Sequence, residues 1–381
     1  MKKTQIVILC LLSTKKYKNL FLCGLLLTAG LAPLASEVMF TPRAQHNTKG
    51  VQAVTDAWNA VAQAHPDSAA AILAKNPGEP GYAGYIYVDF NDAKLRFSGA
   101  HSLFDTNLFQ IVLPSRPSEP DLSRAIAHEA SHAYFANQVP YFGVDRVLPP
   151  RYAVGMFMIS EIAAFLEQAK VEISTRHYDG DIPENISERP EMGEDISLYF
   201  HQLHKYIANT NPDLDENAVW QRACNEFALG FLANDVYMHD SINTLQPEVY
   251  MLKDAKGKAV SNIQARGTYY TPPVLNSRSS QYTANLDVIM RRYLQEAMPA
   301  GVPFTVDVNA WLAELLRNID RIDSERAAKG KTTCSQVDAL MANSMKQVDA
   351  LGDRALDGDM SIGAKSLAWL DALVGAAGQN P

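Results

Sequence analysis

The stretch Asp121-Leu-Ser-Arg-Ala-Ile-Ala-His128-Glu129-Ala-Ser-His132-Ala-Tyr-Phe-Ala136 contains the pattern H-E-x-x-H. Residues four apart on an α-helix lie on the same face, so His128 and His132 can present two imidazoles to one metal ion. Glu129 then lies beside the position of an attacking water. A Zn²⁺ ion acidifies such a water, and a neighbouring carboxylate can take its proton. The pattern therefore predicts a metal-dependent hydrolytic site on a helix.

The flanking residues predict where this helix begins and ends. Ser118-Glu-Pro-Asp121 has the features of a capping box, with Pro in the first turn and acidic residues near the positive end of the helix dipole. Val139-Pro140 predicts the end of the helix. An apolar stripe with small side chains, which allow close packing of a second helix, consists of Leu122, Ile126, Ala130 and Ala133.

Upstream of this helix, the sequence predicts a small, mostly antiparallel sheet. Residues 108–113 have the pattern of a strand, and the turn-rich segment 114–117 closes it. Residues 84–90 and 95–97, joined through Asn91-Asp92, predict a β-hairpin. A strand beside the metal helix can bind an extended substrate by backbone pairing, and the 108–113 strand is the candidate for this role.

The strand, the turn and the H-E-x-x-H helix together resemble the zincin class of zinc metallopeptidases. The downstream residues are similar to the gluzincin branch of that class, in which a Glu on a later helix is the third metal ligand. In Ser160-Glu161-Ile-Ala-Ala164, a Glu is followed three residues later by a small residue, as in gluzincins, and 28 residues separate His132 from Glu161. The resemblance covers residues 108 to 172, which are also similar to bacterial domains described as metallopeptidases. It implies Glu161 as the third ligand.

Other third ligands stay open. Asn225-Glu226-Phe-Ala228 also resembles the gluzincin motif and offers Glu226 instead. An Asp ligand from Gly143-Val-Asp145 fits the spacing of its branch poorly. The metzincin continuation is absent, because Phe135 and Gln138 stand where it requires Gly and His.

Residues that support the ligands cannot be carried over from thermolysin-like enzymes, because Phe165 stands where those enzymes have an Asp. The predicted helix 196–207 places His201 and His204 three residues apart, a spacing that can bind metal. Without an accompanying carboxylate pattern, we interpret them as surface or supporting residues rather than ligands. The candidates for a donor that stabilises the tetrahedral oxyanion are Tyr152, Tyr269 and Tyr270.

Residues 1–36 have the composition of a secretory signal peptide. They contain five Lys and no acidic residue, and their apolar run at 20–34 is too short for a comfortable membrane span. Cleavage near Ala35-Ser36 predicts a periplasmic or secreted protein, and an uncleaved anchor is the alternative. Loss of these five charges takes the formal net charge from −8 to −13. Such a charge argues against nucleic acid or an anionic membrane as the main partner, and we expect no stable membrane insertion.

Only Cys224 and Cys334 remain in the mature chain. In an oxidising compartment they can form one disulfide that joins the middle of the chain to its C-terminal helices. The other interpretation is two separate buried thiols.

The chain is long enough for one large domain or two medium ones. We expect an α+β, zincin-like domain at 37–275 and a largely helical lobe at 276–381, with the cleft between the sheet-bearing and helical halves. Residues 48–75 predict one or two helices, and 252–273 predicts a long loop or an irregular hairpin. Further helices are predicted at 220–237, 286–298, 308–322, 335–356 and 361–377.

The expected function is hydrolysis of a peptide or protein substrate. His128, His132 and Glu161 would hold one Zn²⁺, and Glu129 would act as general base towards the water and then as general acid towards the leaving amine. Two alternatives remain: a zinc hydrolase of a non-protein amide, such as a cell-wall or small-molecule substrate, and a non-catalytic exported scaffold.

Overall fold

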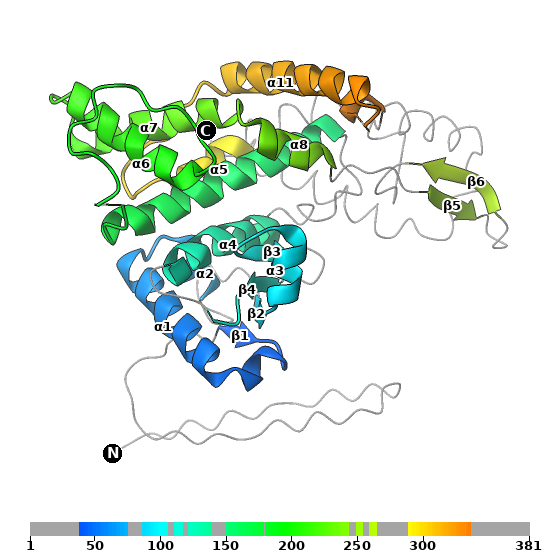
Figure 1. Ribbon diagram of the computed structural model, residues 1–381, viewed down its shortest axis with the longest axis horizontal. Coiled ribbons are helices and arrows are strands. Elements are labelled where there is room, and N and C mark those ends of the chain that lie inside the picture. Colours follow the sequence, from blue (N-terminus) through cyan, green and yellow to red (C-terminus); the bar gives the residue numbers. More distant parts are fainter. Residues whose placement is uncertain are drawn as a thin grey trace, which may run out of the picture. The chain divides into compact units, whose positions relative to one another are not determined.

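The computed structural model has a mixed α+β fold that is mostly helical (Figure 1). The structure describes residues 38–74, 86–105, 110–116, 121–138, 150–178, 180–243, 249–253, 259–264, 289–331 and 333–336. The predicted signal peptide, both predicted ends of the H-E-x-x-H helix, the predicted helix 361–377 and almost all of the predicted helix 335–356 lie outside these residues.

One sheet has four short strands in the order β1-β2-β4-β3, and it is mixed rather than mostly antiparallel as predicted. The strands are β1 (Met39–Phe40), β2 (Tyr87–Phe90), β3 (Leu103–Asp105) and β4 (Gln110–Leu113). β1 and β2 pair in parallel, as do β2 and β4, whereas β3 and β4 are antiparallel. β4, predicted to bind substrate, therefore has a strand on each side, and β1 and β3 are the two edge strands.

The predicted hairpin at 84–97 is wrong, because its second half is a helix, α3 (Asp92–Ser98). The side chain of Asn91 accepts a hydrogen bond from the backbone amide of Lys94, which caps the start of α3. Gly99 ends α3 with a φ of 71°, a conformation that glycine adopts without steric cost. The connection through α3 and β3 returns the chain so that β4 runs parallel to β2.

A first core lies between the sheet and three helices: α1 (Thr48–Ala64), α2 (Ala69–Leu73) and α4 (Asp121–Gln138). The prediction of one or two helices at 48–75 is confirmed, and Ser68 caps α2 by accepting from the backbone amide of Ala71. The buried indole of Trp58 donates to the backbone oxygen of Ala70 at 2.9 Å, which ties α1 to α2. Both helices pack on α4, so they cover the side of α4 that faces this core.

A second core is made by α5 (Pro150–Ser174), α6 (Ile196–Thr210), α7 (Glu216–Phe231), α8 (Asp235–Asn243), α11 (Val308–Ala328) and a helical segment that includes residues 289–297. The helix predicted at 220–237 is two helices, because Asn234 accepts from the backbone amides of Val236 and Tyr237 and starts α8. Trp311 of α11 donates to the backbone oxygen of Ala228 in α7. Helices on both sides of the predicted boundary at residue 275 therefore share this core.

The structure decides between two alternatives for residues 252–273 and two for the cysteine pair. β5 (Val249–Lys253) and β6 (Ala259–Gln264) form an antiparallel hairpin with a register irregularity. Cys224 and Cys334 are two separate buried thiols rather than a disulfide.

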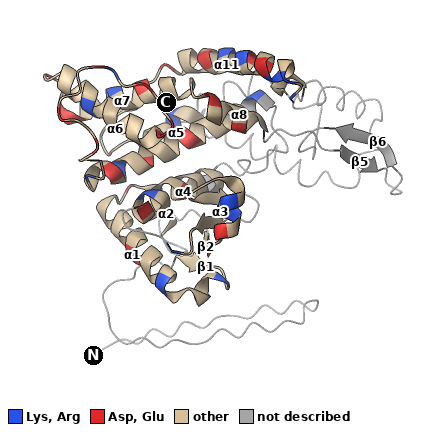
Figure 2. Ribbon diagram, in the orientation of Figure 1, with Lys and Arg blue, Asp and Glu red and all other residues tan. Residues whose placement is uncertain are grey.

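Charged residues of both signs lie side by side along α11, as Figure 2 shows, and Arg321 pairs with Glu325 at 3.0 Å. The second core packs against the opposite, apolar side of this helix, which includes Trp311 and Ile319. Among the described residues, no helix combines the length and the apolar composition that crossing a membrane requires.

Candidate metal centre

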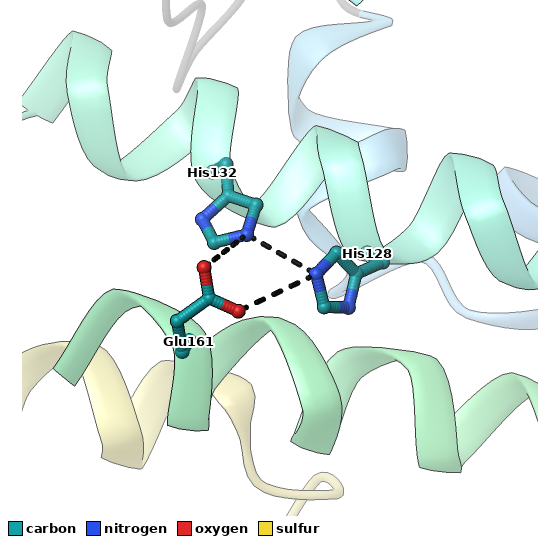
Figure 3. Close-up of side chains that lie close together, drawn as sticks. All are labelled: His128, His132 and Glu161. Atoms are coloured by element: carbon teal, nitrogen blue, oxygen red, sulfur yellow. Dashed lines mark hydrogen bonds and ion pairs between the residues drawn. The ribbon is translucent and has the colours of Figure 1, made fainter. Parts of the chain in front are cut away.

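The candidate site lies where α4 and α5 pack against each other. Ala164, three residues after Glu161 on α5, has a small and fully buried side chain, which permits this close approach. His128 and His132 are one turn apart on the same face of α4, and Glu161 faces them from α5 (Figure 3). Two helices from different cores therefore supply the three side chains.

The three side chains converge on one point. Nε2 of His128 and Nε2 of His132 lie 3.2 Å apart. The Glu161 carboxylate contributes one oxygen 3.5 Å from Nε2 of His132 and another 3.8 Å from Nε2 of His128. In a tetrahedral zinc site, ligand bonds of roughly 2.0–2.2 Å put neighbouring ligand atoms about 3.3 Å apart. The observed separations are therefore close to those that a single zinc ion requires.

The protonation states also suit a metal ion. Burial lowers the pKa of His128 to about 4 and the pKa of His132 well below its ordinary value, so both imidazoles are neutral at pH 7. Burial, with the nearby carboxylates of Glu129 and Asp240, raises the pKa of Glu161 to about 8 in the absence of a cation. A cation at the centre would relieve this cost by stabilising the ionised carboxylate. The donor set thus fits a zinc ion.

Glu129 is buried close to the ligands and is held by the segment that enters β3. The hydroxyl of Ser102 donates to Oε1 of Glu129 at 2.7 Å, and the backbone amide of Phe104 also bonds to this carboxylate. Burial raises the pKa of Glu129 to about 7, although both hydrogen bonds act in the opposite direction. A carboxylate with a pKa near neutrality can both accept and return a proton at pH 7.

A cavity of about 1130 Å³ opens beside these residues. Residues from the sheet side and from the helical side both line it, including Arg96, Ser102, His128, Glu129, Phe165 and Tyr237. The first core supplies α4, and the second supplies α5 and Tyr237 of α8. The only described residues that form a group able to hold a metal, His128, His132 and Glu161, are therefore next to a space that a substrate can enter.

Glu226, the alternative third ligand, is engaged elsewhere. It lies on α7 and pairs with Arg222 at 2.9 Å and with Arg189 at 3.1 Å. Glu161 is therefore the carboxylate that the structure brings to the two histidines, whereas Asp145 lies outside the described residues.

His201 and His204 are not in the group of described residues that could hold a metal ion. His204 packs against Trp220 in the second core, with ring centroids 5.2 Å apart. His201 is buried and bonds to Glu172, which also accepts from Gln168, the side chain that contacts His128.

Three residues near the centre were not predicted from the sequence: Ser102, Gln168 and Tyr237. Tyr237 lines the cavity, and burial together with the carboxylates of Glu161 and Glu129 raises its pKa. Nothing in the local sequence marks these residues, because each reaches the site only through the packing of its element. Of the predicted oxyanion donors, Tyr269 and Tyr270 and the side chain of Tyr152 lie outside the described part of the chain.

No family model, curated protein or solved structure matches this chain. The geometry of the centre between α4 and α5 therefore has to support any functional assignment. The centre combines the neutral imidazoles of His128 and His132 with the carboxylate of Glu161. Beside them lies Glu129, whose pKa is near neutrality.

Proposed function

We propose that this protein is a zinc-dependent metallopeptidase of the zincin class, with a gluzincin-like ligand set. The observation that supports the proposal is the convergence of His128, His132 and Glu161 within ligand distance of one point, with Glu129 beside them. Three protein ligands, with a fourth position left for water or substrate, are typical of a catalytic rather than a structural zinc site.

Each residue then has a defined role. A Zn²⁺ ion in this site would supply acidification of water and polarisation of the scissile carbonyl. Glu129 takes a proton from the attacking water and returns it to the leaving amine, which its pKa of about 7 permits. Ser102 holds the Glu129 carboxylate in place. Tyr237 stays protonated at neutral pH, because its pKa is raised, and is our candidate donor to the oxyanion of the transition state.

The surroundings suit an extended peptide. The cavity of about 1130 Å³ is larger than many small-molecule pockets, which measure roughly 300–1,000 Å³. The edge strand β3 directly follows Ser102, so a peptide paired with β3 would run beside Glu129. We propose that the substrate is a peptide or protein, and that residues 1–36 direct the chain to the periplasm or the exterior.

The test compares the wild type with Glu129→Gln, both loaded with zinc. We expect the wild type to cleave a peptide library and the variant to keep one zinc per chain while its turnover falls by about 10²–10⁴-fold. Glu226→Gln is the matched control. It makes the same substitution at a Glu on α7 that pairs with Arg222, and it should keep both zinc and turnover. A zinc-loaded wild type that leaves every peptide uncut would contradict a peptidase. Cleavage of a cell-wall amide by that sample would then identify the other hydrolase class.

A further inference from the structure

Gln168 connects the candidate metal centre to a buried polar network behind it. It lies on α5 two turns after Glu161, and its side chain is buried. Its Oε1 is 3.0 Å from Nδ1 of His128. Its Nε2 donates to Glu172 at 2.8 Å and to the hydroxyl of Ser197 at 3.2 Å.

Glu172 determines which way the Gln168 amide points. An ionised carboxylate can only accept hydrogen bonds, so the amide must turn its NH₂ group towards Glu172. Glu172 also accepts from the Ser197 hydroxyl and from Nε2 of His201, the latter at 2.9 Å, and it is 1% exposed. These contacts, each from α6, hold the carboxylate in one place. The oxygen of the amide is therefore directed at His128.

The direction of this oxygen selects the tautomer of His128. Oε1 of Gln168 can only accept, so Nδ1 of His128 must bear the proton. Nε2 is then unprotonated and points towards His132 and Glu161, as a ligand nitrogen must. His132 differs, because its Nδ1 bonds to the hydroxyl of Ser160, which can donate or accept. Only one of the two histidines is thus fixed by its partner.

We propose that Gln168, oriented by Glu172, is a positioning residue that holds His128 in the Nδ1–H tautomer and directs Nε2 at the metal. The proposal rests on the proposed function of the site. Phe165 stands where thermolysin-like enzymes have an Asp, and its ring packs against His128 with centroids 4.8 Å apart. Gln168, three residues further along the same helix, supplies an acceptor in this chain.

The first test is the tautomer of His128 in the metal-free protein, measured by ¹⁵N NMR of labelled histidines and assigned with His128→Ala. We expect the Nδ1–H form in the wild type and a mixture of tautomers in Gln168→Leu. This readout needs neither zinc nor turnover, so it separates failure of this proposal from failure of the proposed function. A pure Nδ1–H form in Gln168→Leu would overturn the proposal.

The second test is zinc affinity, measured by competition with a chelating dye. We expect Gln168→Leu to bind zinc about 10–100-fold more weakly than the wild type. Glu172→Gln, which keeps the side-chain volume and removes the carboxylate that enforces the orientation of Gln168, should bind about tenfold more weakly. Glu226→Gln is the matched control for that change and should bind as the wild type does.

A double variant distinguishes positioning from packing. Gln168→Glu combined with Glu172→Gln exchanges the two side chains, so a carboxylate at position 168 now accepts from His128, and an amide at position 172 donates to that carboxylate. We expect this variant to regain zinc affinity to within about threefold of the wild type. If its affinity stays as low as that of Gln168→Leu, the residues act only by filling space, and the proposal fails.

Discussion

The hydroxyl of Ser102 donates a hydrogen bond of 2.7 Å to the carboxylate of Glu129, and this contact joins the segment before β3 to the H-E-x-x-H helix α4. The bond stabilises the ionised form of Glu129 against the cost of burial. The edge strand and the proposed general base are therefore fixed relative to each other.

Ser102→Ala should move the acidic limb of the pH profile of kcat/KM to higher pH. Glu129 accepts a proton only when it is ionised, so activity falls as pH drops below its pKa. Loss of the Ser102 hydrogen bond raises that pKa, and the limb should shift upwards by about one unit. Ser102→Thr keeps the hydroxyl and serves as the control. An unmoved limb in Ser102→Ala would show that the contact does not tune Glu129.

Tyr237→Phe should lower kcat by about 10²-fold and change KM little, because the lost hydrogen bond forms only in the transition state. Zinc content should be unchanged, since Tyr237 is not among the ligands. Tyr87→Phe, on the partly exposed β2, is the control. Steady-state kinetics on one peptide substrate measure the effect. A kcat within about threefold of the wild type would assign oxyanion stabilisation to another residue.

Zinc affinity should rise with pH up to about pH 8. The ion binds ionised Glu161, whose pKa is raised to about 8 in the metal-free protein, so binding below this pH releases a proton. One released proton gives about a tenfold gain in affinity per pH unit, and the gain stops above the pKa. The histidines add no slope near neutrality, because burial lowers the pKa of both. Competition with a chelator across this range measures the slope, and a plateau above about pH 6.5 would contradict it.

The two histidines of the site could be predicted from the sequence, because their approach depends only on local helix geometry. The spacing of His128 and His132 needs only the pitch of a helix, and α4 is that helix. The approach of Glu161 was implied by resemblance alone, and the structure places its carboxylate 3.5 Å from His132. Gln168 and Ser102 gave no signal, because a Gln within a helix and a Ser in a turn are ordinary surface residues until other elements pack over them.

The sheet was predicted less well, for a physical reason that residues 91–99 illustrate. Leu95 and Phe97 alternate with polar residues as in a strand, yet Leu95 is buried and Phe97 is 95% exposed. In a strand both side chains would lie on one face. Asn91 and Gly99 were the informative residues, because they mark the start and the end of a short helix.

Direct titration of the metal-free protein with zinc tests whether His128, His132 and Glu161 hold one zinc ion. We expect one zinc per chain in the wild type and in Glu226→Gln. Tight binding should be lost in His128→Ala, His132→Ala and Glu161→Gln, since each removes one of three ligands. Wild-type affinity in Glu161→Gln, or loss of zinc in Glu226→Gln, would contradict the account.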